Sequence, residues 1–149
     1  MTIGELLGRI GQGMAAGLVG TAAMTASAAV EMHVRHRPPS TTPAKAVESI
    51  LEVEPTTAKA ETRLADLTHW SYGTAWGGVR GLIGAIGFHG PLAAVLHFAT
   101  TWGTELLILP RLGVTPPVAE WGSTELGIDA LHHAVYATAT SAAYEFLAG

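Results

Sequence analysis

The chain has 149 residues, no cysteine and a formal net charge of −4, and 48% of its residues are hydrophobic while only 13% are charged. This length fits one domain, residues 1–149, and the lack of cysteine excludes disulfide frameworks, thiolate metal sites and iron–sulfur clusters. Because Lys and Arg form no basic block, we expect no nucleic-acid partner, and the low charge content indicates an integral protein of the lipid bilayer.

The first predicted membrane span covers about residues 10–32. Its stretch Ile10–Val30 holds 21 residues without a charge, and about 20 apolar residues suffice to cross the hydrocarbon core. Gly13 and Gly17 form a GxxxG pair, which lets two helices approach closely in lipid. The stretch is longer than that of a signal peptide and further spans follow, so we expect a retained helix that stops at Pro38-Pro39.

Residues 33–65 are predicted to form a polar loop. Thr41 or Thr42 can cap a helix with Pro43 in its first turn, and the apolar residues that follow predict a short amphipathic helix, broken at Pro55. We expect this helix to lie on the membrane or on the bundle, and an ordinary loop helix is an equal alternative.

Three further spans are predicted at about residues 66–88, 91–109 and 124–147. Four spans with two short links and one long link predict an all-α fold, an integral membrane four-helix up-and-down bundle. A soluble four-helix bundle rich in Ala and Gly is the alternative. Most Lys and Arg of the connections fall in the first and third loops, so the positive-inside rule places both loops in the cytoplasm and both termini outside.

Ionisable residues recur in all four spans at a similar depth. Two spans supply a lone Glu and the other two supply Asp-x-x-His, a pattern similar to the ligand order of ferritin-like di-iron bundles, although those have Glu-x-x-His. Carboxylate and imidazole ligands without thiolates suit Fe, Mn or Zn, and ionisable groups within spans mark ion, proton or ligand sites. We therefore expect a cluster that binds a metal ion or relays protons. Its predicted members are Glu31, Asp66, His69, Glu105, Asp129 and His132.

Two other histidines complete this prediction. His97 is expected to support the cluster or to line its entry, and His133 is the alternative to His132 as the residue that points into it. Taken singly, each polar residue has an ordinary explanation, because charges near helix ends often complement the helix dipole. Arg80 is expected either to extend outward or to pair with Glu145.

Two other functions remain open. Gly13 and Gly17, together with Gly73, Gly77 and Gly81, predict faces through which the chain packs as an accessory subunit in a larger membrane complex or as a homo-oligomer. In that case the ionisable residues of the four spans serve only to form hydrogen bonds between helices. The third possibility is haem between two histidines such as His69 and His132.

Several short motifs extend over most of the chain. They are Glu31 followed by Arg37-Pro38-Pro39, His69-Trp70, Gly113-Val114-Thr115-Pro116-Pro117, and Asp129 with His133-Ala134-Val135-Tyr136. In these features the chain resembles the YagU-like family of small bacterial inner-membrane proteins. The resemblance implies a multi-pass protein of the bacterial inner membrane, with a tie to acid tolerance in one branch of the family. It implies no catalytic residues.

Overall fold

The computed structural model describes residues 1–38 and 40–149, and in these residues the chain is all-α, without strands. This confirms the predicted fold class. The helices are α1 (Ile3–Arg35), α2 (Thr42–Leu51), α3 (Ala58–Ala85), α4 (Gly90–Arg111) and α5 (Ser123–Ala148), with a single 3₁₀ turn, η1 (Val118–Glu120), before α5.

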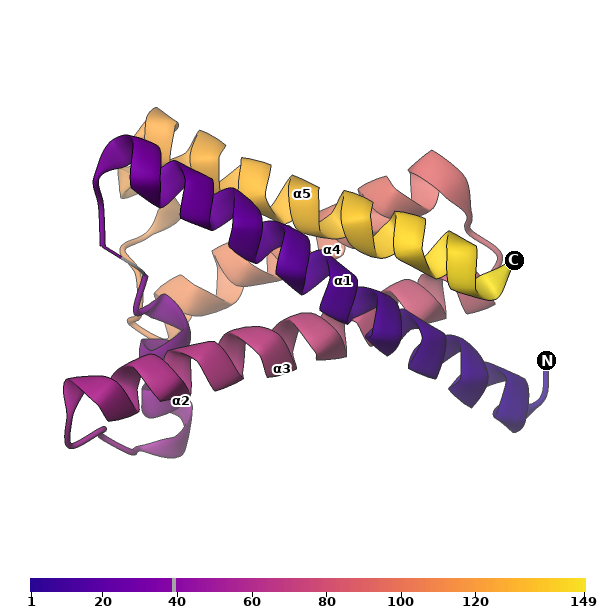
Figure 1. Ribbon diagram of the computed structural model, residues 1–149, viewed down its shortest axis with the longest axis horizontal. Coiled ribbons are helices and arrows are strands. Elements are labelled where there is room, and N and C mark those ends of the chain that lie inside the picture. The colour runs from indigo at the N-terminus through magenta and orange to yellow at the C-terminus, as the bar shows by residue number, and fades with distance from the viewer. Residues whose placement is uncertain (39) are drawn as a thin grey trace.

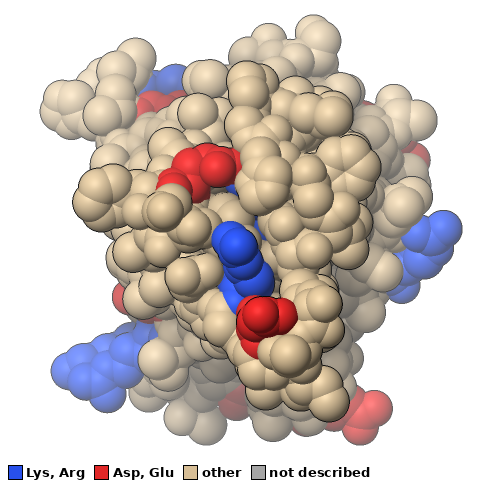
Figure 2. Space-filling model, turned by 90° about the vertical axis from the view of Figure 1, so that its right-hand side faces the viewer, with Lys and Arg blue, Asp and Glu red and all other residues tan. Residues whose placement is uncertain are grey.

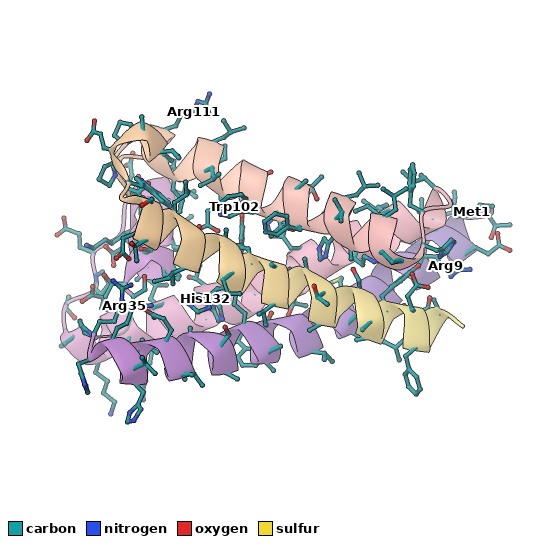
Figure 3. The ribbon with its side chains drawn as sticks, turned by 90° about the horizontal axis from the view of Figure 1, so that it is seen from above. Met1, Arg9, Arg35, Trp102, Arg111 and His132 are labelled. Atoms are coloured by element: carbon teal, nitrogen blue, oxygen red, sulfur yellow. The ribbon has the colours of Figure 1, made fainter. Side chains whose placement is uncertain are left out.

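The four long helices, α1, α3, α4 and α5, run alternately in opposite directions (Figure 1). The described residues of two connections, 36–38 with 40–57 and 112–122, lie at one end of the molecule, which we call the loop end. Both chain termini and the α3–α4 turn lie at the other, the terminal end. Helix α1 packs on α3 and α5, and α4 packs on α5 and α3. Figure 3 shows Arg35 and Arg111 at the loop end and Arg9 at the terminal end.

Helices α1 and α3 are longer than the spans predicted for them, about residues 10–32 and 66–88. Thr2 caps α1 by accepting a hydrogen bond from the Glu5 amide, so this helix begins before residue 10. Thr57 caps α3 in the same way, so α3 begins well before residue 66 and the predicted loop 33–65 shrinks to 36–57. Helix α1 ends at Arg35, whereas Pro39 of the predicted stop lies outside the described residues.

The predicted amphipathic helix is α2. It begins at Thr42 with Pro43 in its first turn, and it buries Ala44. It lies against α3, and the Ser49 hydroxyl donates a hydrogen bond to the Leu112 carbonyl oxygen, at 3.1 Å. Of the two expected positions, α2 therefore occupies the one on the bundle.

Helices α1 and α3 cross with their backbones in contact. A Cβ added to Gly13 would lie 2.7 Å from the Gly81 nitrogen, and one added to Gly77 would lie 2.6 Å from the Gly17 Cα. A Cβ on Gly73 would strike the Thr21 hydroxyl. The five glycines predicted to form packing faces are thus used inside the molecule, and they no longer support a partner subunit.

The interior of the molecule is unusually polar. Its buried polar and charged residues are Thr21, Arg80, His97, Thr101, His132, His133, Thr140 and Ser141, whereas Ile83 is the one large aliphatic residue among the buried hydrophobic ones in the described chain. Large apolar side chains face outward instead, among them Val19, Ile86, Val95, Leu131 and Phe146.

Helices α1 and α4 are long and apolar enough to cross a membrane. A soluble core helix or a signal sequence can meet the same criterion, but only 28% of the apolar window of α1 and 17% of that of α4 are buried in the molecule. Within the described residues, α3 and α5 do not meet it, so spans at 66–88 and 124–147 stay predictions.

Candidate functional site

The candidate site lies on the inward face of α5. The buried residues of this helix recur at intervals of three and four, from His132 and His133 through Tyr136 and Thr140 to Tyr144, so they share one side of the helix. Trp102 and His132, both labelled in Figure 3, lie in the half of the molecule nearer the loop end.

His133 and Glu105 form the closest contact in this site. The His133 Nε2 lies 2.5 Å from the Glu105 Oε2, and the His133 Nδ1 lies 2.9 Å from the carbonyl oxygen of Asp129. A carbonyl oxygen only accepts, so Nδ1 must carry a hydrogen and donate it. A neutral ring then has no hydrogen left on Nε2, although Nε2 faces a carboxylate oxygen.

The contact between His133 and Glu105 therefore requires a second proton. Either His133 is an imidazolium that donates to the Glu105 carboxylate, or a neutral His133 accepts from a protonated Glu105. The pair is electrically neutral in both cases. Because His133 is only 5% exposed, this neutrality is what allows the pair to lie in the interior.

Asp129 lies beside this pair but is directed toward α4. The Trp102 indole nitrogen donates a hydrogen bond to the Asp129 Oδ2, at 2.7 Å. The other carboxylate oxygen lies 3.8 Å from the His133 Nδ1. A sequence offers no signal for this contact, because it depends on the rotation of α4 relative to α5.

Glu31 and His132 belong to a separate group near the loop end. The Arg37 Nε donates to both Glu31 oxygens, at 2.8 and 2.7 Å. Arg35 also contacts Glu31, and its Nη2 donates to the Glu125 Oε1 at 2.6 Å. The His132 Nδ1 bonds the Ser27 hydroxyl at 2.8 Å, and its Nε2 stays 4.0 Å from Glu31.

His69 and Asp66 do not join either group. The Thr25 hydroxyl donates to the Thr21 carbonyl oxygen, so it must accept from the His69 Nε2, 3.1 Å away. Asp66 is exposed on α3. Both supposed haem ligands, His69 and His132, thus bond hydroxyl groups of α1, and nothing in this geometry supports haem.

The predicted metal ligands consequently do not form one centre. Across residues 1–38 and 40–149, no three His, Asp or Glu side chains are placed to hold a metal ion. Glu31 is held by Arg37, Asp129 by Trp102, and both His133 nitrogens are engaged. The residues present do not fit a di-iron-like site, and metal binding stays a prediction that this geometry does not support.

A second charged pair lies nearer the terminal end. Arg80 is fully buried, with a relative exposure of 0%. Its Nη2 donates to the Glu145 Oε1 at 2.6 Å, its Nε donates to the Ser141 hydroxyl at 3.1 Å, and its guanidinium carbon lies 4.3 Å from the centre of the Tyr144 ring. Of the two alternatives for Arg80, pairing with Glu145 is confirmed.

His97 lies between the two charged pairs. It is fully buried, its Nε2 bonds the Trp76 carbonyl oxygen at 3.0 Å, and its ring centre lies 5.4 Å from that of Tyr136. The Tyr136 hydroxyl donates to the Gly73 carbonyl oxygen at 2.6 Å. The structure thus separates His97 from its predicted place at the entry of the cluster.

Comparison of the chain with protein-family models, with curated proteins and with solved structures finds no match.

Proposed function

We propose that the protein is an integral membrane protein with four spans, and that its interior binds and relays a proton at His133 and Glu105. The inverted distribution of polar and apolar side chains supports the membrane location. The contact between His133 and Glu105 supports the proton.

The inverted distribution argues against a water-soluble bundle. In water, folding is driven by burial of apolar surface, and this chain buries mainly small and polar residues while large apolar side chains face outward. In a bilayer the outward face needs to be apolar, and helices associate through small residues and interhelical hydrogen bonds. The α1–α3 glycine crossing and the buried histidines fit these requirements.

The dimensions of α5 also fit a bilayer. Glu125 lies 20 residues before Glu145, a separation of about 30 Å along a helix, which is about the thickness of a hydrocarbon core. Glu125 pairs with Arg35 at one end and Glu145 with Arg80 at the other. Charges of α5 are thus compensated near both proposed membrane surfaces.

The observation that carries the proton assignment is the 2.5 Å contact between the His133 Nε2 and the Glu105 Oε2, with Nδ1 already donating. Ionisable groups inside spans are costly and mark ion, proton or ligand sites. A proton shared between an imidazole and a carboxylate keeps the pair neutral, and it can leave only to another buried acceptor or to water. The accessory-subunit alternative has lost its main support, and the YagU-like assignment stays a prediction.

The test is a proton inventory of the purified protein in detergent at neutral pH. We expect ¹⁵N spectra of labelled histidine to show His133 protonated on both nitrogens, or infrared spectra to show a protonated carboxyl that disappears in Glu105→Gln. The matched control is Glu125→Gln, which removes an exposed carboxylate and should leave both signals unchanged. A singly protonated His133 beside an ionised Glu105 would refute the proposal.

A further inference from the structure

The interior contains polar atoms that the site at His133 and Glu105 does not use. Six of these buried atoms lack a hydrogen-bond partner among the described residues: the His97 Nδ1, the His132 Nε2, the Thr101 and Thr140 hydroxyls, the Tyr144 hydroxyl and the Arg80 Nη1. Buried polar atoms nearly always have a partner, and exceptions call for an explanation.

Four of these atoms, those of His97, Thr101, Thr140 and Tyr144, belong to two facing rows of side chains, one on α4 and one on α5. On α4, His97, Thr101 and Glu105 recur every fourth residue, so they lie on one side of that helix. The two rows meet twice, where Glu105 contacts His133 and where His97 lies against Tyr136. Thr101 lies between these two meeting points along α4.

The α5 row then continues to the second charged pair. Thr140 follows Tyr136 by one turn, and Ser141 next to it accepts a hydrogen bond from Arg80. Arg80 in turn donates to Glu145. Glu145 lies 12 residues after His133, a separation of about 18 Å along the helix.

We infer that the protein conducts protons across the membrane along the polar side chains of these two rows, which together we call the file. The file runs from Glu105 and His133 past Thr101 to His97, and on past Thr140 to Glu145. This inference rests on the proposed function, and it adds an exit for the proton at Glu145 and a route through the bundle to that exit. His97 is the relay group at the middle of the file, because it is the histidine between the two charged pairs.

The bonding of His97 suits this relay. Its Nε2 donates to the Trp76 carbonyl oxygen, so the neutral ring keeps a free lone pair on Nδ1. A proton that arrives on Nδ1 forms an imidazolium, and loss of this proton to the next hydroxyl or to water restores the neutral ring. The transfer makes and breaks only N–H and O–H bonds.

Both ends of the file have access to the surface. The Glu105 side chain is 18% exposed and that of Glu145 is 39% exposed, whereas His97 between them is fully buried. Figure 2 shows that the face at the terminal end is largely uncharged, with a basic group between two acidic groups near its centre. The charge of Arg80 is balanced by Glu145, so it does not leave this end of the file with a net positive charge.

The experiment measures proton flux into liposomes that contain the purified full-length protein. A potassium gradient with valinomycin sets the voltage, and an enclosed pH-sensitive dye reports protons. We expect the native protein to conduct protons and His97→Gln to reduce the flux to that of empty liposomes. The Gln amide can still donate to the Trp76 carbonyl oxygen, so a purely structural role of His97 would leave the flux unchanged. His33→Gln, which changes an exposed histidine, is the matched control and should conduct normally.

A second variant guards against misfolding of His97→Gln. Thr101→Val keeps the shape of the side chain and removes an unpaired hydroxyl, so it should fold and lower the flux. Native flux in both variants would overturn the inference. So would the absence of flux in the native protein, or a potassium leak as large as the proton flux. If the shared proton of His133 and Glu105 is still detected in such a case, the conduction path fails while the proposed binding of a proton at this pair stands.

Discussion

Removal of the Glu145 charge should destabilise the protein far more than removal of the Glu125 charge. Both carboxylates accept a hydrogen bond from an Arg Nη2 at 2.6 Å. The side chains of Arg80 and Glu145 are 0% and 39% exposed, whereas those of Arg35 and Glu125 are 35% and 58% exposed. The two pairs thus share this short contact. Arg35 donates a second hydrogen bond to Glu125, so the pair with the buried arginine is the one with fewer bonds between its partners.

The magnitude follows from the charge that is left behind. Breaking a buried ion pair by removing one partner costs about 3–5 kcal/mol. Glu145 is partly exposed, and a Gln at this position can still accept a hydrogen bond. For Glu145→Gln we therefore expect the free energy of unfolding to fall by about 2 kcal/mol. This corresponds to a roughly 30-fold change in the folding equilibrium. Glu125→Gln should have little measurable effect, because exposed pairs contribute little.

The assay is unfolding by SDS in mixed detergent micelles, followed through the fluorescence of the four tryptophans. The double variant Arg80→Met with Glu145→Gln should recover most of the loss, because no charge is then left buried and unpaired. Equal effects of Glu145→Gln and Glu125→Gln would show that the burial of Arg80 does not govern the energy of its pair, and would refute this reasoning.

Three further predictions test the packing and the topology. Gly77→Ala should cost about 1–3 kcal/mol, because its Cβ would lie 2.6 Å from the Gly17 Cα; Gly103→Ala, with nothing within 4 Å of its Cβ, should be neutral or stabilising, and similar losses in the same SDS assay would contradict the close crossing. Trp102→Phe should cost about 1–3 kcal/mol, since it leaves the Asp129 carboxylate without its indole donor; an unchanged unfolding midpoint would argue against that bond. Because the chain has no cysteine, single cysteines can report topology: in oriented vesicles, Gly113→Cys should react with an impermeant maleimide only from the cytoplasmic side and His89→Cys only from the opposite side, and labelling of both from one side would exclude the four-span arrangement.

The order of the helices could be predicted from local signals. Long apolar stretches, threonine caps and prolines near the breaks predict where the helices begin and end, so the all-α class and the bounds of α4 and α5 agree closely with expectation. The starts of α1 and α3 were placed too late. Polar residues can occupy the exposed first turns of a helix once a threonine caps it. A prediction that relies on apolar content therefore misses those turns.

The partners of the polar residues depended on the tertiary structure. Sequence spacing predicts that Glu105, His132 and His133 lie at a similar depth, because helix rise fixes depth. It does not specify the rotation of each helix about its axis. Adjacent residues point about 100° apart on a helix, so His133 meets Glu105 while His132 turns to Ser27 of α1.

The amino-acid sequence thus determined the helical class, the chain order and the position of each ionisable group along its helix, since these follow from periodicity and rise along a single helix. The tertiary structure decided that the five glycines pack within the molecule, that the six predicted ligands do not meet at one centre, and that Arg80 pairs with Glu145. These outcomes depend on how closely and at what rotation the helices pack, which is a property of the helix pairs and not of any one segment.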